Sequence, residues 1–132
     1  MIKIIDRYFS YKDERGSLEG IINYGQWREL NIIESCAGTI RGNHYHKDIH
    51  ELFIILDGEI KVVAQRVVNH KLFGRQSEKI VKTGDAFIVE PMINHTFYVI
   101  KNSRWINVLS NPFDKHNPDL HRIKSIGNIN AK

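Results

Sequence analysis

Short runs of β-branched and aromatic residues, separated by turn residues at regular intervals, recur along most of the chain. This pattern is typical of an antiparallel β-sandwich or barrel. No segment longer than about a dozen residues has a 3.6-residue hydrophobic period, so the sequence predicts an all-β domain. The runs expected to form strands are 2–8, 17–23, 28–35, 39–46, 51–57, 59–67, 79–82, 86–90, 95–101 and 104–110.

The turn residues between these runs include one strong signal. Asp57-Gly58 separates ELFIIL from EIKVVA, and an Asp-Gly pair between two apolar runs is typical of a β-hairpin, so we predict a hairpin turn there. An all-β chain of this length must protect its sheet edges, and closure into a barrel or a two-sheet jelly roll does so. The interior of such a barrel can hold one small ligand, which enters at one mouth.

The length and composition limit the possible architectures. The 132 residues suffice for one domain with its own core, so we expect a single domain spanning residues 1–132. The contents of 42% hydrophobic and 26% charged residues are those of an ordinary globular protein. Residues 111–132 contain Pro112 and Pro118 among many polar residues, and we expect them to form an extended C-terminal arm.

The charge and the apolar runs narrow the range of partners. The net charge of +4 comes from scattered Lys and Arg residues, without a basic helix, so nucleic acid is not expected as a partner. A mildly basic surface suits a small anion such as a diphosphate. The longest apolar runs, such as LFIIL at 52–56, are too short to cross a bilayer. The N-terminus MIKIIDRYF lacks the layout of a signal peptide, so we expect a cytoplasmic protein without a membrane partner.

The single cysteine, Cys36, cannot form an internal disulfide, which fits a reducing compartment. Because Cys36 follows the apolar run LNIIES, we expect it to be a small packing residue rather than a reactive thiol.

The stretch RGNHYHKDIHELFIILDG, residues 41–58, places three of the seven histidines within seven positions. His44 and His46 are two residues apart, so on a strand their side chains share a face. Glu51 opens the next predicted strand and can lie beside them, and His95 opens a later strand that could border the same cavity. Three imidazoles and one carboxylate suit Zn, Mn, Fe, Co or Ni, with one or two positions left for water or substrate.

The other histidines are weaker candidates. His50 precedes Glu51 directly and therefore points to the opposite face if both lie on one strand, which indicates a surface position. His70, His116 and His121 lie in polar, loop-like surroundings, and we expect them to be solvated.

The spacing of the candidate ligands resembles the two-part signature of the cupin superfamily. The first part reads Gly38, five residues, His44-Tyr45-His46, four residues, Glu51, six residues and Gly58; the second reads Gly84-Asp85 followed by AFIVEPMINH. Met92 stands where the second part commonly has a glycine. The resemblance implies a double-stranded β-helix, the cupin jelly-roll barrel. Some cupins keep these histidines as bases or hydrogen-bonding groups without a metal, but the complete ligand set favours a divalent metal, zinc before Mn, Fe, Co or Ni.

Further motifs resemble cupins that act on nucleotide-linked sugars. Asp13-Glu14-Arg15-Gly16 and Arg41-Gly42-Asn43-His44 are similar to the D-x-R-G and R-G-x-H segments of dTDP-4-dehydrorhamnose 3,5-epimerases and dTDP-4-keto-6-deoxyglucose 3,4-ketoisomerases. The GNHYH segment and the tail NPFDKHNPDLHRI resemble the zinc-binding cupin domain of bacterial capsular polysaccharide reductases, which epimerises a UDP-linked 4-keto-6-deoxy amino sugar. The resemblance implies an isomerase of surface polysaccharide biosynthesis whose substrate is a nucleotide-linked keto sugar.

The resemblance also implies roles for individual residues. Arg15, Arg41 and Asn43 are expected to bind the substrate. The two arginines suit its phosphate groups, because a guanidinium binds phosphate oxygens bidentately. Alternatively, Arg15 only anchors a turn through Asp13. Removing the proton beside the ketone needs a base and a group that stabilises the enolate oxygen.

His44 is the first candidate for this base, with His95 or a tyrosine returning the proton. If His44 binds a metal instead, the metal polarises the carbonyl or holds a hydroxide, and Tyr45, Tyr98 or His50 moves protons. The sequence leaves both possibilities open.

Two other functions are compatible with the same residues. One is a metal-dependent oxygenase or lyase that acts on another small molecule, and the other is a non-catalytic sugar-nucleotide-binding module that serves a partner enzyme. In every case we expect a homodimer, because an exposed N-terminal strand within residues 1–20 gains stability by pairing with a neighbour, and related cupins exchange such strands.

Overall fold

The computed structural model describes residues 2–123, and within this range the chain forms β-strands and no helix. The all-β class expected from the hydrophobic pattern is therefore confirmed. The strands are β1 (Ile2–Ile5), β2 (Phe9–Asp13), β3 (Gly16–Gly20), β4 (Glu29–Ser35), β5 (Ile40–His44), β6 (Glu51–Val68), β7 (Lys71–Lys82), β8 (Ala86–Val89) and β9 (Ile93–Leu109).

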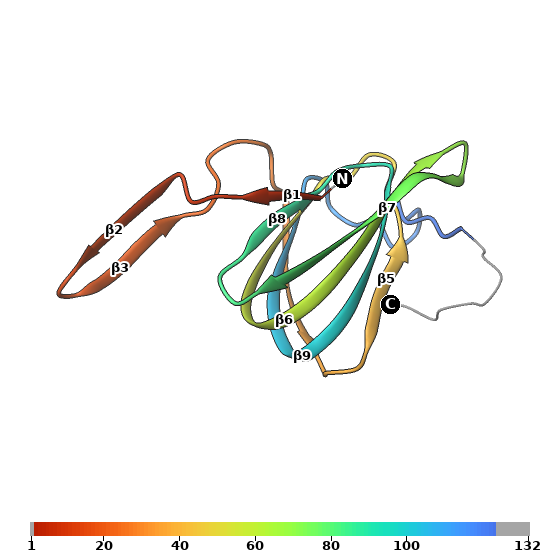
Figure 1. Ribbon diagram of the computed structural model, residues 1–132. Helices are drawn as coiled ribbons and strands as arrows, with labels where there is room; N and C mark the ends of the chain where they lie inside the picture. The colour runs from red at the N-terminus through yellow and green to blue at the C-terminus, as the bar shows by residue number, and fades with distance from the viewer. Residues whose placement is uncertain (1, 124–132) are drawn as a thin grey trace.

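Seven of these strands form one antiparallel sheet that curls into a barrel (Figure 1). The order along the sheet is β1-β8-β6-β9-β4, while β5 pairs with β9 and β7 pairs with β6. The long strands β6 and β9 pair with each other along almost their whole length and therefore take part in both halves of the barrel. This arrangement is the jelly-roll barrel implied by the cupin-like spacing.

The predicted hairpin at Asp57-Gly58 is wrong, because β6 continues through it and both halves of β6 pair with β9. The register shifts on both sides of Asp57, so the strand carries a β-bulge there and bends. Gly58 is required for a different reason: its φ is 123°, and a Cβ at this position would lie 2.0 Å from Ser103 Oγ. The predicted gap between 95–101 and 104–110 is likewise a bend inside β9, opposite this bulge.

The tight turn after β6 lies at Asn69-His70, where both residues have positive φ angles of 52° and 59°. Asn-His lacks the glycine that usually marks such a turn. For this reason the sequence predicted a strand only over 79–82, whereas β7 spans residues 71–82.

Residues 9–20 form a separate two-stranded hairpin, β2–β3, which projects away from the barrel (Figure 1). The run predicted over 2–8 is split accordingly, because only residues 2–5 join the main sheet as β1. The predicted run over 17–23 also ends earlier, at Gly20.

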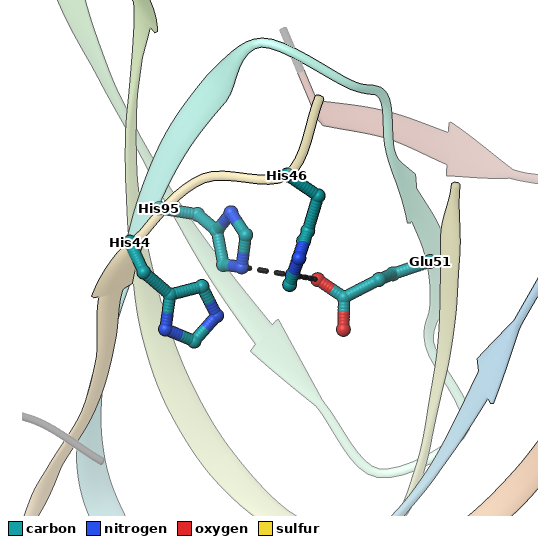
Figure 2. A group of neighbouring side chains, drawn as sticks. All are labelled: His44, His46, Glu51 and His95. Atoms are coloured by element: carbon teal, nitrogen blue, oxygen red, sulfur yellow. Dashed lines mark ion pairs between the residues drawn. The ribbon is translucent and has the colours of Figure 1, made fainter. Parts of the chain in front are cut away.

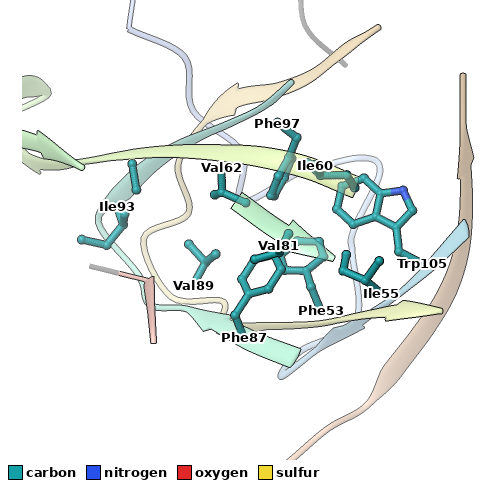
Figure 3. Close-up of a cluster of buried hydrophobic side chains, with 11 residues drawn as sticks. Phe53, Ile55, Ile60, Val62, Val81, Phe87, Val89, Ile93, Phe97 and Trp105 are labelled. Carbon is teal, nitrogen blue, oxygen red and sulfur yellow. The ribbon is translucent and has the colours of Figure 1, made fainter. Parts of the chain in front are cut away.

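The barrel interior is filled by an aromatic and aliphatic core (Figure 3). The ring of Phe53 lies 5.1 Å from the rings of both Phe87 and Phe97, and Phe97 meets Trp105 edge-on at 4.9 Å. The imidazole of His95 lies 5.4 Å from Phe97. The core therefore supports the strands that carry the candidate ligands and forms one wall of their surroundings.

The structure also bears on two expectations from the sequence, one about the packing of Cys36 and one about segments that could span a membrane. Cys36 is exposed rather than packed, because it lies in the loop after β4, where its carbonyl oxygen accepts a hydrogen bond from Thr39 Oγ1 at 2.6 Å. Among residues 2–123, no helix is long and apolar enough to span a membrane.

Candidate metal centre

The structure brings together the four residues proposed as metal ligands (Figure 2). His44, His46, Glu51 and His95 each offer one nitrogen or oxygen atom, and these atoms all lie within 4.8 Å of one another. Glu51 Oε1 lies 2.8 Å from His46 Nε2 and 3.1 Å from His95 Nε2. Three members of the cluster are buried, and His44 alone is partly exposed. His44 is therefore the member of the cluster with the most exposure to solvent.

A bulge in β5 directs His44 toward the barrel interior. Arg41 pairs with Phe97 and His44 pairs with His95, so both face the barrel interior although they are three residues apart. The register shift between Gly42 and His44 absorbs the extra residue, with φ angles of 84° at Gly42 and 55° at Asn43. A Cβ at Gly42 would lie only 2.7 Å from the carbonyl oxygen of His95.

Backbone carbonyl groups fix the tautomers of two histidines. His95 Nδ1 lies 2.9 Å from the carbonyl oxygen of Ile93, and His46 Nδ1 contacts the carbonyl oxygen of Asp119. Because a carbonyl oxygen can only accept, Nδ1 of each ring carries a proton and donates it. The Nε2 atoms of both rings then face Glu51, and in the neutral rings their lone pairs are available to a metal, the usual arrangement for metal-binding histidines.

The cluster contains an unusual concentration of unsatisfied polar atoms. Among residues 2–123, the buried side-chain atoms without a hydrogen-bond partner are His44 Nδ1, His46 Nε2, Glu51 Oε1, Asn94 Oδ1 and His95 Nε2. The contacts between Glu51 and the two histidines are short, but they lack the directionality of hydrogen bonds. An unsatisfied buried group costs about 1–3 kcal/mol. A divalent cation at the common focus would satisfy four of these five atoms, so the residues fit a metal.

Burial and neighbouring charges set the protonation of the cluster. Burial lowers the pKa of His44 to about 2, and the charges of His95 and His46 act in the same direction. Burial would raise the pKa of Glu51, but the contacts with His46 and His95 outweigh it and hold this pKa below its usual value. Burial would lower the pKa of His46, but the contact with Glu51 raises it overall. Neutral His44 and ionised Glu51 are the forms that bind metals.

Asn107, which the sequence did not predict, orients the glutamate. Its Nδ2 donates to Glu51 Oε2 at 2.9 Å, and its Oδ1 accepts a hydrogen bond from Asn31 Nδ2 at 3.3 Å. Glu51 Oε1 is thereby left facing the histidines. A polar residue at an inward position of β9 was the available signal, but such a signal can be recognised only after the face of the strand is known.

The C-terminal arm fastens the loop between His46 and Glu51 through Asp119, a second residue that the sequence did not predict. The backbone N–H groups of residues 47–49 donate to the Asp119 carboxylate at 2.8, 2.8 and 3.0 Å. Burial would raise the pKa of Asp119, but these hydrogen bonds outweigh it and lower the pKa. Because the Asp119 carbonyl also accepts from His46 Nδ1, this residue positions both the loop and a ligand.

The two tyrosines predicted to move protons lie outside the cavity. Tyr45 points away from its neighbours His44 and His46: its hydroxyl group bonds to His70 Nδ1 at 2.6 Å, and its ring lies 5.3 Å from that of His121. Tyr98 follows the inward-facing Phe97 and faces outward, where Lys61 Nζ lies 5.0 Å from its ring centroid.

The remaining histidines lie on the outside of the barrel. His50 faces away from the cavity and pairs with Glu90 at 2.7 Å, and His116 is exposed. His70 and His121 were expected to be solvated, but both contact Tyr45. His121 is also half-buried, because its backbone pairs with that of Tyr45.

The predicted substrate-binding residues are dispersed. Arg15 lies at the tip of the β2–β3 hairpin and bonds to Asp13 Oδ2 at 2.6 and 3.0 Å, so within this chain it anchors the turn. Arg41 faces inward but donates to Ser35 Oγ at 2.7 Å and to the carbonyl oxygen of residue 34 at 3.0 Å. Asn43 lies in the bulge beside His44, where Asn94 Nδ2 donates to its Oδ1 at 3.4 Å.

Comparisons with known proteins agree with this fold. Residues 11–121 match the Polysaccharide biosynthesis C-terminal domain family. No curated protein matches the sequence significantly. Among solved structures, dTDP-4-dehydrorhamnose 3,5-epimerase from Elizabethkingia anophelis superposes with a TM-score of 0.72 at 23% identity, covering 87% of this chain and 72% of that one.

Two further structures are comparably similar. A 3,4-ketoisomerase from Helicobacter canadensis has a TM-score of 0.72 at 17% identity, covering 92% of this chain and 90% of its own. A dTDP-6-deoxy-D-glucose-3,5-epimerase from Legionella pneumophila, in complex with dTDP-4-keto-L-rhamnose, has a TM-score of 0.68 at 20% identity, with coverages of 88% and 75%. At these identities the likeness establishes a shared fold.

Proposed function

Because the chain belongs to the Polysaccharide biosynthesis C-terminal domain family, we propose that it epimerises or ketoisomerises a nucleotide-linked 4-keto-6-deoxy sugar by enolisation. The observation that carries the proposal is the convergence of His44, His46, Glu51 and His95 within the barrel. The similar solved structures include isomerases of this type, one in complex with dTDP-4-keto-L-rhamnose and another with TDP. The family description supports a role in polysaccharide biosynthesis.

The proposal includes a divalent metal, with zinc as the first choice, held by His44, His46, Glu51 and His95. The unsatisfied donor atoms and the fixed tautomers of His46 and His95 support it. When bound, such a metal supplies a Lewis acid that polarises a carbonyl oxygen of the substrate. Mn, Fe, Co and Ni suit the same mixture of nitrogen and oxygen ligands.

The low pKa of His44 favours its role as a ligand over its role as a base. A general base works best when its pKa lies near the operating pH, whereas burial lowers the pKa of His44 to about 2. Neutral imidazole is the form that binds a metal. In the metal-free alternative, His44 is the base, because it is the one member of the cluster that is partly exposed and can reach a substrate.

The proposal is tested by proton NMR in D2O with dTDP-, UDP- and GDP-linked 4-keto-6-deoxy sugars. We expect the C3 or C5 proton signal of one sugar to disappear, which identifies the enolised carbon. His44→Asn should abolish this exchange, whether His44 is base or ligand. The matched control is His116→Asn, which makes the same change at an exposed position of the arm. Exchange by His44→Asn within a few-fold of the unsubstituted protein would contradict the proposal, as would the absence of exchange with every sugar.

A non-catalytic sugar-nucleotide-binding module is the second candidate. The positions of Tyr45 and Tyr98 outside the cavity favour it, because neither phenol can return a proton to a sugar bound there. Such a module would broaden the NMR signals of its ligand without proton exchange. An oxygenase or lyase is supported by the donor set alone, and oxygen uptake would identify the former.

We also propose that the protein is a homodimer whose contact includes the β2–β3 hairpin. Tyr8, Phe9, Tyr11 and Leu18 on or beside this hairpin are 46–62% exposed. A two-stranded hairpin is only marginally stable by itself in water, so a second copy that covers these side chains would stabilise it. Light scattering should give twice the chain mass, and a monomer at micromolar concentration would contradict the proposal. The cytoplasmic location stays a prediction.

A further inference from the structure

The C-terminal arm returns to the barrel beside β5 and forms an antiparallel bridge there. The backbone N–H of Tyr45 donates to the carbonyl oxygen of His121 at 2.9 Å, and the N–H of His121 donates back at 3.0 Å. Residues directly opposite in such a pair project to the same face. The 5.3 Å separation of the Tyr45 and His121 rings agrees with this rule.

This register places Arg122 across from His44. The arm and β5 run in opposite directions, and Tyr45 pairs with His121. The residue after His121 on the arm, Arg122, therefore lies across from the residue before Tyr45 on β5, His44. Successive side chains of an extended segment alternate between faces, so extended geometry beyond the bridge would turn Arg122 toward the face of His44, opposite to Tyr45 and His121. Directly opposed residues have Cβ atoms about 4.5–5.5 Å apart.

The charges of the site agree with this placement. Burial is the main cause of the lowered pKa of His44, followed by the charges of His95 and His46, and the charge of Arg122 adds to them. Arg122 is exposed, whereas His46, Glu51 and His95 are buried. Arg122 therefore lies at the surface beside His44 rather than among the ligands.

The arm is held firmly at this point. The Asp119 carboxylate accepts three backbone N–H donors from residues 47–49 and also contacts His121 Nε2 at 3.0 Å. With the Tyr45–His121 bridge, these contacts hold the backbone on both sides of Leu120. The backbone that carries Arg122 is thus ordered before any ligand arrives.

We propose that Arg122 binds the diphosphate of the sugar nucleotide beside His44, an inference that rests on the proposed function. A planar guanidinium matches phosphate oxygens with two parallel hydrogen bonds. Arg15 and Arg41, the arginines expected from sequence motifs, lie farther along the chain from the cluster's ligands or turn toward Ser35. Arg122 is the arginine whose charge acts on His44, a member of the cluster.

Isothermal titration calorimetry tests this role with dTDP, UDP, inorganic diphosphate and the nucleosides thymidine and uridine. Arg122→Gln should weaken the binding of nucleoside diphosphates and of inorganic diphosphate roughly ten- to a hundredfold, the loss expected for a hydrogen bond to a charged group. It should leave nucleoside binding unchanged. Arg122→Lys should recover part of the loss, because it keeps the charge but not the bidentate geometry.

Arg104→Gln is the matched control. Arg104 is also exposed, its Nη1 lies 3.8 Å from Glu34 Oε1, and it lies toward the opposite end of β9 from His95. We expect this variant to bind every probe as the unsubstituted protein does. Equal thermal midpoints and equal metal contents of the variants would exclude a change in the fold or in the cluster.

The outcomes separate this inference from the proposed function. Equal affinities of Arg122→Gln and the unsubstituted protein for every phosphate-containing probe would overturn the inference, as would the absence of binding of all of these probes. If a sugar exchanges its proton and Arg122→Gln leaves the KM for that sugar unchanged, the proposed function stands and the inference about Arg122 fails. If binding of inorganic diphosphate depends on Arg122 but no sugar exchanges protons, the anion site stands and the enzymatic proposal fails.

Discussion

Replacing Asp119 with asparagine should disturb both the stability of the domain and its affinity for metal. The carboxylate accepts from Lys47 N and His121 Nε2 through Oδ1, and from the N–H groups of residues 48 and 49 through Oδ2. An amide keeps one acceptor oxygen and presents donors on its other side. At least one backbone N–H must therefore face an N–H2 group and lose its partner.

The magnitude follows from the bonds that are lost. A hydrogen bond to a charged group contributes about 1.5–3 kcal/mol, so Asp119→Asn should lower the free energy of unfolding by about that amount. Because the loop of residues 47–49 connects His46 to Glu51, its loosening should also weaken metal binding roughly ten- to a hundredfold, as do other substitutions of residues that orient metal ligands.

Urea unfolding of the metal-free protein measures the first effect, and titration with Zn²⁺ against a competing chelator measures the second. Asp114→Asn is the matched control, because Asp114 lies on the same arm and accepts from His116 N at 2.9 Å without contacting the cluster. Its metal affinity should equal that of the unsubstituted protein. If the two variants bound Zn²⁺ equally well, Asp119 would not position the site.

Three further predictions concern the cluster, the bulge and the hairpin. The purified protein should contain about one divalent metal per chain, and Glu51→Gln should lower this content in elemental analysis; full occupancy of this variant would count against Glu51 as a ligand. Gly42→Ala should destabilise the protein more than Gly38→Ala in urea unfolding: their φ angles are 84° and 86°, but a Cβ meets a backbone oxygen at 2.7 Å only at Gly42. The extra loss should be about 1–3 kcal/mol, typical of overpacking, and equal losses would refute the account of the bulge. Leu18→Ser should shift the protein toward monomer in light scattering, because Leu18 is 62% exposed on the hairpin; an unchanged dimer would exclude it from the contact.

The sequence predicted the features that depend on local alternation and spacing. His44 and His46 share a face because they are two residues apart on an extended chain, and Glu51 meets them after a loop of four residues. The type of fold was also recognisable, because short runs of β-branched and aromatic residues alternate with turn residues along most of the chain.

Features that depend on contacts between distant segments were not predictable in this way. Asp57-Gly58 reads as a hairpin locally, but pairing with β9 on both sides converts it into a bulge, and the close approach of Ser103 explains the glycine. The role of Asp119 depends on a contact with a loop about seventy residues earlier in the chain. Tyr45 lies between two candidate ligands in sequence, but alternation sends its side chain to the opposite face, where its hydroxyl group bonds to His70.

The attachment of the arm has a consequence for the order of events during protein synthesis. When β9 has left the ribosome, every strand of the barrel is available for pairing, but the loop of residues 47–49 still lacks the carboxylate that fastens it. His46 likewise lacks the carbonyl group that selects its tautomer. A barrel formed from strands β1 to β9 alone would lack these contacts, so the loop and His46 are fixed in place only when the arm docks. If the cluster binds a metal as proposed, a chain that ends before Asp119 should bind it more weakly than the full chain.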